Sequence, residues 1–235
     1  MSSQHNTKEA YPIGSSSDEY TIHLSIKDCW KEINIIAPAL AYPAGVDLYR
    51  QGSAPQGVYL IESGLVKLSR LENDGQEIID LRFPGWLLGA YSVLIQKVYP
   101  VTAVTLTNCH LRYIPAGIFE QEVKTNLQVS WYVHQMHSRE VDSQFSRLTM
   151  LGCETAKHRL EQLLWLLSSL EMPTAQNGVR MQLPLKGREI TRWIAVTPAY
   201  LCRLFEQLES EGIIRRHKGW LIIPNTQKIW HYSDV

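Results

Sequence analysis

The sequence predicts an α+β protein built from an N-terminal β-sandwich, a long connecting helix and a C-terminal winged helix-turn-helix. Up to Pro115, turn residues interrupt short apolar runs about every ten residues, which is typical of an antiparallel sandwich or barrel. Between Asn126 and Met150 there is no glycine or proline, so a long helix can form. Two short helical patterns joined by a tight turn then precede an alternating basic segment at 212–223.

The composition is that of a globular protein. The 235 residues include 23 Lys and Arg against 23 Asp and Glu, and 45% are hydrophobic, which excludes a disordered or collagen-like chain. No run approaches the ~18 consecutive apolar residues of a membrane span. Residues 1–17 are polar, unlike a secretory signal, and the cysteines lie far apart, as in a protein with reduced thiols: Cys29, Cys109, Cys153 and Cys202. We therefore expect a soluble, cytoplasmic protein.

The β-sandwich is expected over residues 21–125, after a flexible, serine-rich tail at 1–20. Its clearest hairpin is centred on Asn73-Asp74-Gly75, between apolar runs at 66–71 and 78–81. Glycine tolerates the positive φ that such a tight turn requires. This segment is expected to be the sensor part of the chain.

A long dimerisation helix is expected over residues 126–150. It carries a heptad stripe with alternating steps of four and three: Leu127, Trp131, His134, Ser138, Val141, Phe145 and Leu148. The stripe favours a seam between two subunits, in which the polar members help to set the register. The alternative is a core helix within one subunit, which also shows an apolar stripe. Gly152 breaks the helical pattern, so we expect a hinge at 149–152.

The winged helix-turn-helix is expected within residues 151–235. Thr197 is a favoured N-cap and Pro198 a favoured first helical residue, so a second helix begins there after a turn at 195–197. The second helix of such a motif enters the major groove, where Arg203 is placed to reach guanine, and a basic wing contacts phosphates. The predicted DNA contacts are Lys186, Arg188, Thr197, Ala199, Tyr200, Arg203, Gln207, Arg215, Arg216 and Lys218.

The charge distribution supports this placement. Residues 1–152 carry 12 basic and 15 acidic side chains, whereas residues 153–224 carry 10 basic and 7 acidic ones. A local basic region on a neutral chain indicates contact with a polyanion. The alternative is a helical hairpin with surface arginines, which leaves the capped turn and the basic wing unexplained.

This order of elements resembles the CRP/FNR superfamily of bacterial transcription regulators, named after the cyclic-AMP receptor protein and the fumarate–nitrate regulator. The resemblance covers about residues 30–225. It is carried by the strand pair Y-x-I-x-x-G-x-V within residues 57–68, a hairpin at 74–79 and a strand at 83–89 with the pattern F-x-G-x-x-x-G, which is similar to a glycine-containing strand of the family. Residues 188–190 and 203–209 fit the family's helix-turn-helix. It implies a jelly-roll sandwich like that of cyclic-nucleotide-binding domains, and a homodimer that binds a two-fold symmetric promoter site and contacts RNA polymerase.

The chain departs from that family where a cyclic nucleotide would bind. The family's Gly-Glu pair, whose carboxylate accepts from ribose, reads Gly89-Ala90 here, and its Arg-Ser pair, which holds the phosphate, reads Tyr99-Pro100. Without these charge-assisted bonds, cyclic AMP loses its strongest contacts. We expect an unidentified effector in a pocket formed by Gly89, Ala90, Tyr91, Ser92, Tyr99, Trp131 and His134.

Other cofactors are poorly matched by the residues. An iron–sulfur cluster needs four close thiolates, and this chain has Cys29 alone before Cys109. Thiol redox between those two cysteines stays open, although buried inert cysteines are commoner. Haem has weak candidate ligands in His23, Cys29, Cys109, His110 and His134, and a lone strand histidine is more often a core residue. No metal site is expected, and the cofactor is left unknown.

The sequence therefore predicts a homodimeric DNA-binding regulator that is not an enzyme. Ala199 stands where family members often present a glutamate that reads cytosine, so the operator need not match theirs. A regulator that binds DNA constitutively, without an effector, is the main alternative. A metal-dependent cupin-like enzyme is a remote one, because the strand region offers only His110, and no phosphate loop or G-x-S-x-G motif occurs.

Overall fold

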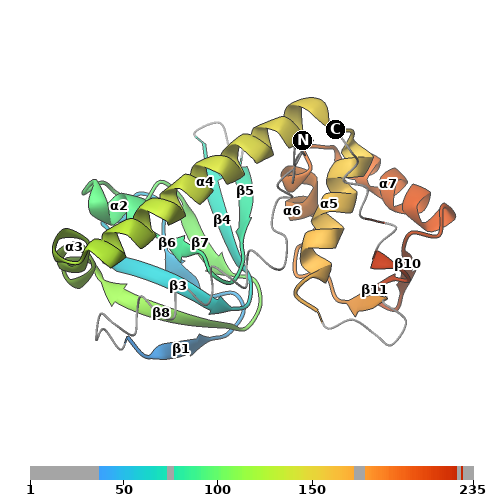
Figure 1. Cartoon of the computed structure of the whole chain (residues 1–235). Helices are drawn as coiled ribbons and strands as arrows, with labels where there is room; N and C mark the ends of the chain where they lie inside the picture. Colours follow the sequence, from blue (N-terminus) through green and yellow to red (C-terminus); the bar gives the residue numbers. More distant parts are fainter. Residues whose placement is uncertain (1–36, 73–76, 172–177, 227–228, 230–235) are drawn as a thin grey trace, which may run out of the picture.

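The computed structural model describes residues 37–72, 77–171, 178–226 and 229. It consists of a β-sandwich and a smaller helical unit with a three-stranded sheet, and one long helix runs along the sandwich to the second unit (Figure 1). The predicted tail, the turn at 73–75 and the haem candidates His23 and Cys29 lie outside the described residues.

The sandwich has two antiparallel four-stranded sheets. One has the strand order β1-β8-β3-β6, and the other has the order β2-β7-β4-β5. Their bounds are β1 Ala39–Tyr42, β2 Asp47–Tyr49, β3 Gly57–Ser63, β4 Val66–Leu71, β5 Glu77–Arg82, β6 Leu87–Leu88, β7 Thr102–Thr105 and β8 Cys109–Pro115. The predicted pairing of β4 with β5 is confirmed, because Val66 lies opposite Arg82 and Leu71 opposite Glu77. Ile61, Val66 and Leu111 are fully buried between the sheets.

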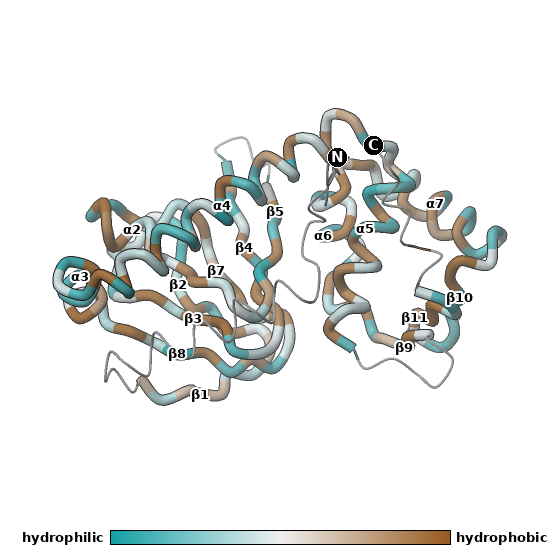
Figure 2. Tube along the Cα trace, in the orientation of Figure 1, coloured by the Kyte–Doolittle hydropathy of each residue, from teal (hydrophilic) through white to brown (hydrophobic). Residues whose placement is uncertain are grey.

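Three helices follow or interrupt the sandwich: α2 Ala90–Leu94, α3 Ala116–Thr125 and α4 Leu127–Cys153. Asn126 caps α4, and its Oδ1 accepts from the backbone N–H groups of Gln128 and Val129 at 3.0 and 3.4 Å. One face of α4 packs Val129 and Val133 onto the sandwich. The trace of α4 alternates between hydrophobic and hydrophilic residues, as expected of a helix with one packed face (Figure 2).

Gly152 does not end the long helix, and the predicted hinge at 149–152 is wrong. Helix α4 continues to Cys153, and the backbone becomes extended only at Glu154, with φ −91° and ψ 151°. A glycine costs a helix about 1 kcal/mol relative to alanine, which a helix anchored by packing tolerates. The break comes at Glu154 because Thr155 caps the next helix by accepting from the N–H of His158.

The C-terminal unit contains a helix-turn-helix and a hairpin. Its elements are α5 Ala156–Ser168, β9 Val179–Met181, α6 Gly187–Trp193, α7 Pro198–Ser210, β10 Arg215–His217 and β11 Trp220–Ile223, with sheet order β10-β11-β9. Leu163, Ile190, Leu204 and Leu221 are all buried in its core. The two short helices, the turn and the hairpin therefore have the architecture that the sequence predicted.

A second contact, besides α4, joins the two units. Helix α6 packs against β5, so Leu65, Ile79 and Leu81 of the sandwich share one buried cluster with the C-terminal core. Two ion pairs cross the same interface: Lys67 with Glu189, and Glu77 with Arg192. No pattern in the sequence predicted this interface, because the residues that form its ion pairs lie more than a hundred positions apart.

Candidate nucleic-acid interface and ligand cavity

The turn between α6 and α7 fixes the orientation of the second helix. Ala195 has a positive φ of 53°, which reverses the chain within a few residues. Thr197 then caps α7 by accepting from the N–H of Tyr200 at 3.3 Å, and Pro198 occupies the first turn. The inward side of α7 is buried, through Leu201, Leu204, Phe205 and Leu208. The opposite side is consequently free to meet a partner.

The predicted base-reading residues lie on this outward side. Ala199, Tyr200, Arg203 and Gln207 are all exposed, and within the described chain Arg203 has no ion pair or side-chain hydrogen bond. Gln207 is partly engaged, since its Nε2 donates to Glu211 at 2.9 Å. Lys186, at the start of α6, and Arg188, one residue into it, are also exposed.

The wing is a tight hairpin with a basic tip. His217 pairs with Trp220, so only Lys218 and Gly219 form the loop, with φ values of 47° and 82° as in a type I′ turn. Arg215 and Lys218 are exposed. Arg216 is instead held by the protein: it donates to Glu209 at 2.5 Å and lies over the Phe205 ring at 5.2 Å. Arg216 is also exposed, so a phosphate would compete with Glu209 for its guanidinium, and its predicted DNA contact stays a prediction.

Arg180 is an exposed cation outside the predicted set of DNA contacts. Its guanidinium lies over the Trp220 ring of the wing, 4.2 Å from the centroid, and Arg180 itself belongs to β9. Cation–aromatic contact of this kind holds a strand pair together while leaving the charge near the surface. The spacing along the sequence could not reveal it, because β9 and β11 meet only in the folded sheet.

Removing the cap of α7 should weaken the C-terminal unit. We expect Thr197→Ala to lower the free energy of unfolding by about 1 kcal/mol, because the N–H of Tyr200 loses its acceptor. Urea unfolding followed by circular dichroism measures this change. Thr197→Ser keeps the hydroxyl and serves as the control; if it destabilised the protein as much as alanine, the capping bond would not be the cause.

The predicted seam residues form an exposed stripe on α4. Leu127 is 85% exposed, Trp131 61%, Phe145 65% and Leu148 64%. Val141 is 54% exposed, and the polar members His134 and Ser138 are exposed as well. Single chains seldom leave a row of large apolar side chains in water, and contiguous patches of this kind mark interaction sites.

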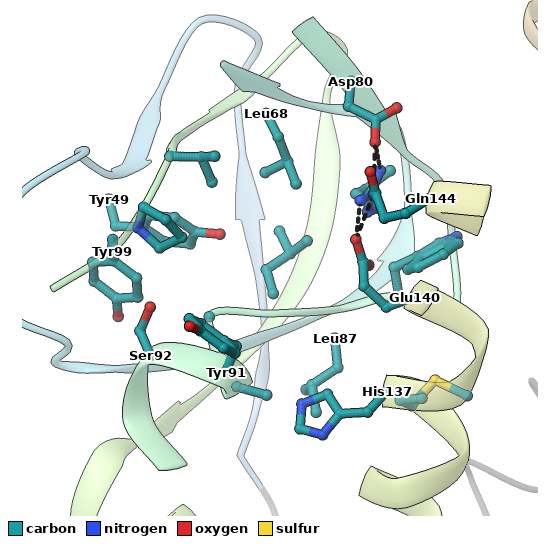
Figure 3. Close-up of a pocket in the computed structure, with 18 of the residues that line it drawn as sticks. Tyr49, Leu68, Asp80, Leu87, Tyr91, Ser92, Tyr99, His137, Glu140 and Gln144 are labelled. Atoms are coloured by element: carbon teal, nitrogen blue, oxygen red, sulfur yellow. Dashed lines mark hydrogen bonds and ion pairs between the residues drawn. The ribbon is translucent and has the colours of Figure 1, made fainter. Parts of the chain in front are cut away.

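A cavity of about 460 Å³ lies between the sandwich and α4 (Figure 3). Five of the predicted pocket residues line it: Gly89, Ala90, Tyr91, Ser92 and Tyr99. Trp131 and His134 do not line it. They stack on each other on the seam side of α4, with ring centroids 5.8 Å apart. The helix instead presents Met136, His137, Glu140, Val141 and Gln144 to the cavity, at the spacing of one helix face.

The apolar wall of the cavity is stiffened by tyrosines. Tyr49 and Tyr99 stack with ring centroids 4.0 Å apart, and burial together with Tyr99 raises the pKa of Tyr49 well above its ordinary value. The Tyr99 hydroxyl donates to the carbonyl of Gly57 at 2.6 Å. Tyr99, which the resemblance places at the family's Arg-Ser pair, therefore braces the strands here.

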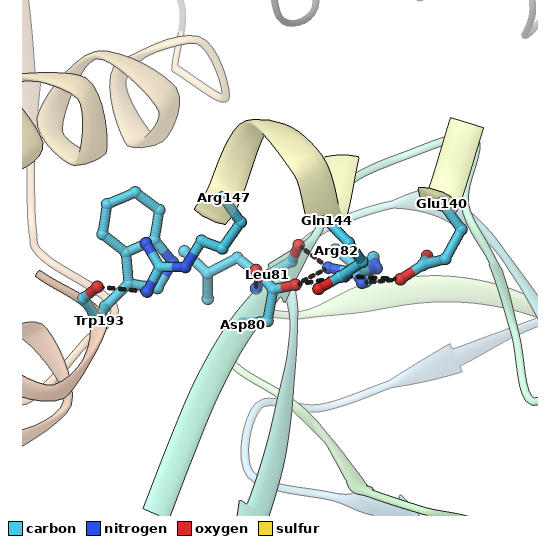
Figure 4. Close-up of polar contacts among 7 residues, drawn as sticks. All are labelled: Asp80, Leu81, Arg82, Glu140, Gln144, Arg147 and Trp193. Carbon is cyan, nitrogen blue, oxygen red and sulfur yellow. Dashed lines mark hydrogen bonds and ion pairs between the residues drawn. The ribbon is translucent and has the colours of Figure 1, made fainter. Parts of the chain in front are cut away.

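A buried arginine ties the cavity floor to α4 (Figure 4). Arg82 is 3% exposed; it donates to Asp80 at 2.6 Å, to the carbonyl of Leu81 at 2.9 Å and to Glu140. Burial alone would lower the pKa of Arg82, but Asp80 and Glu140 raise it above its ordinary value, so it stays charged. Gln144 completes the cluster by donating to Glu140 at 2.9 Å.

The same helix carries a contact onward to the helix-turn-helix. Arg147, one turn beyond Gln144, lies over the Trp193 ring at 4.1 Å and donates to the Trp193 carbonyl (Figure 4). Burial lowers the pKa of Arg147 to about 10, so its charge persists at neutral pH. Trp193 ends α6, and therefore the cavity cluster and the C-terminal unit are joined through a few packed side chains.

The remaining cofactor candidates do not assemble into a site. Cys109 is buried, and burial raises the pKa of its thiol, while His110 is exposed and shares a 3.0 Å hydrogen bond with Ser63. Within the described ranges no group of three or more metal-ligating side chains occurs. None of the helices in those ranges is both long and apolar enough to cross a membrane.

Comparisons with known proteins agree with this geometry. Residues 39–126 match the family described as cyclic nucleotide-binding domain. The chain is 24% identical over 204 residues to a probable transcriptional activator of Rhizobium leguminosarum, covering 85% of this chain and 82% of that one. It is 24% identical over 179 residues to the cyclic AMP receptor protein of Thermus thermophilus, covering 76% and 80%.

Solved structures show the same fold. FixK2 from Bradyrhizobium japonicum superposes with a TM-score of 0.71 at 21% identity, covering 86% of this chain and 99% of that one. TTHB099, a CRP-family regulator from Thermus thermophilus, gives a TM-score of 0.68 at 19% identity, covering 81% and 94%. The fold matches that of solved transcription regulators, and the curated relatives are named as transcription regulators. In sequence and in fold the chain is similar to members of the CRP/FNR superfamily, in agreement with the resemblance seen in its sequence.

Proposed function

We propose that this regulator is a homodimer that binds a two-fold symmetric promoter site and responds to an effector other than a cyclic nucleotide. The observation that carries the proposal is the free outward face of α7, with Arg203 exposed beside a basic wing. The exposed stripe of α4 supports pairing of two chains along that helix. By family resemblance the bound dimer contacts RNA polymerase in the cytoplasm, and the chain has no catalytic role.

Helix α7 and the wing have different roles in DNA binding. Helix α7 enters the major groove, and Arg203 donates to guanine, while Arg215 and Lys218 of the wing contact phosphates. Two such helices in a dimer must sit about 34 Å apart to reach successive major grooves. Any change in the angle between the paired α4 helices and the C-terminal unit alters that spacing.

Ligand binding in the cavity can change the angle between α4 and the C-terminal unit. Arg82 binds Glu140 of α4, which also accepts from Gln144. One turn further along α4, Arg147 donates to the Trp193 carbonyl at the end of α6, so a ligand that moves α4 also moves α6. The bend that absorbs the motion is at Glu154, where the helix ends, in place of the hinge predicted from Gly152. An effector can shift the population only through its differential affinity for the two arrangements.

Cyclic nucleotides fit the cavity poorly. A phosphate needs an available cation, but Arg82 is already bound by two carboxylates, and Arg70 pairs with Glu72 at 2.6 Å. The match of residues 39–126 to the cyclic nucleotide-binding family supports the shape of the domain. The residues inside that shape favour another ligand. A regulator without any effector is the second candidate, and the experiment below separates the two.

Selection of binding sites from random duplex DNA at near-physiological salt tests the proposal. We expect a palindrome with half-sites about 10 base pairs apart. Enrichment without any added effector would favour the constitutive reading or an inhibitory ligand. Failure to enrich any sequence, even in the presence of a cavity ligand and with a folded dimer, would refute sequence-specific binding.

Arg203→Ala is expected to cost about 1–3 kcal/mol of operator binding and to relax specificity at one base pair of each half-site. The reason is the loss of a bidentate contact to one guanine. Fluorescence anisotropy with the selected operator and its single-base variants measures both effects. Lys218→Ala is the control, because loss of a phosphate contact should weaken binding to every DNA sequence alike. If Arg203→Ala also lowered the affinity equally for every sequence, Arg203 would be a phosphate contact too.

A further inference from the structure

Two carboxylates meet one arginine at the wall of the cavity. Arg82 is shared between Asp80 and Glu140, whereas Arg70 pairs with Glu72. Arg82, Asp80 and Glu140 together carry one net negative charge, and Arg139 lies nearby over the Trp86 ring, 4.9 Å from its centroid. The Glu140 side chain is 39% exposed, so solvent screens its charge in part.

The cavity also offers unused hydrogen-bond acceptors. Glu140 accepts from Arg82 and Gln144 through its Oε1 alone, and its Oε2 is left without a hydrogen bond to the described residues. His137, one turn earlier on α4, has a buried Nε2 that finds no partner in the described chain. Figure 3 shows both side chains on the side of α4 that faces the cavity.

Two neighbouring hydroxyl groups already donate to backbone carbonyls. The Tyr99 hydroxyl donates to the Gly57 carbonyl at 2.6 Å, and the Ser92 hydroxyl donates to the Val98 carbonyl at 3.4 Å. Burial lowers the pKa of His137, so this imidazole adds no positive charge at neutral pH. The rest of the lining is largely aromatic and aliphatic, including Trp86 and Tyr49.

We propose that the cavity binds a small organic cation, a protonated amine carried on an apolar body, with its N–H groups donating to Glu140 and His137. The assignment rests on the proposed function, because it names the ligand class of the same cavity. Aromatic faces add attraction for a cation, and the surplus carboxylate charge repels anions. An anionic effector would have to displace Arg82 from its carboxylates before it could bind.

Three probes of one shape and different charge test this proposal. Benzylamine, benzyl alcohol and benzoate each carry one phenyl ring, and calorimetric titration of the full chain at pH 7 measures their affinities. We expect benzylamine to bind at least about tenfold more tightly than benzoate, with the alcohol between them, because only the amine gains a charge-assisted bond. Benzoate binding as tightly as benzylamine would overturn the proposal, and so would no binding by any probe up to about 10 mM.

The variant Glu140→Gln tests whether the ligand amine binds to Glu140. It removes the surplus charge, so the preference for the amine should fall by about tenfold and benzoate binding should rise. Asp142→Asn is the matched control, because Asp142 is exposed on the same helix and does not line the cavity. An unchanged preference in Glu140→Gln would contradict the assignment. If the protein selects an operator but prefers benzoate, DNA binding stands and only the ligand class fails.

Discussion

Replacing Phe145 by aspartate should convert the protein to a monomer and weaken operator binding more than about a hundredfold. Phe145 is 65% exposed in the single chain and lies in the apolar stripe of α4 with Leu148 and Val141. Burying one large apolar side chain contributes about 1.5–3 kcal/mol, and a two-fold seam contains each residue twice. The substitution removes both contributions and places two carboxylates against an apolar surface.

Analytical ultracentrifugation and anisotropy on the same samples measure the two effects together. Ile118→Asp is the matched control, because Ile118 is a 46% exposed apolar residue on α3, outside the stripe. We expect that variant to remain dimeric and to bind DNA normally. A dimeric Phe145→Asp protein with unchanged operator affinity would show that the stripe is not the seam, and that the subunits meet elsewhere or act singly.

Features with a short sequence period were predictable. Strand pairing at β4–β5, the stripe of α4 and the buried face of α7 each depend on residues close together in the chain, so alternation or helical spacing reveals them. The capped start of α7 was equally local, since Thr197 and Pro198 adjoin. Those patterns indicate which face of a helix is apolar, and this was enough to place the predicted DNA contacts of α7 on its exposed side.

Contacts between distant residues were not predictable. Arg82 forms an ion pair with Glu140, which lies 58 residues later, and the sequence near each residue does not predict the pair. The ion pair of Lys67 with Glu189 is a second example, because only the packing of α6 on β5 brings these two residues together. The predicted pocket residues Trp131 and His134 lie on the correct helix but on the face that points away from the cavity. The residues four positions after the buried Val133 and Met136 are His137 and Glu140, and this spacing would have indicated the cavity face.

Replacing Arg82 by methionine should produce the largest loss of stability at a single site, about 3 kcal/mol in the free energy of unfolding. Arg82 is nearly inaccessible, and its removal leaves Asp80 and Glu140 without the counter-charge that they share. Both carboxylates are partly exposed, so water recovers some of the cost and the expected loss lies at the lower end for a broken buried pair. Chemical unfolding at pH 7 measures it.

Arg70→Met is the control, because Arg70 also lines the cavity but pairs with Glu72 near the surface, where such pairs contribute about 0–1 kcal/mol. The double variant Arg82→Met with Glu140→Met adds a second test. It removes one orphaned carboxylate, so it should be more stable than Arg82→Met alone, and the coupling between the two sites should exceed about 1 kcal/mol. Simple addition of the two single effects would mean that Arg82 stabilises the protein mainly through its packing on Trp86, and that the charge cluster does not hold α4 to the sandwich.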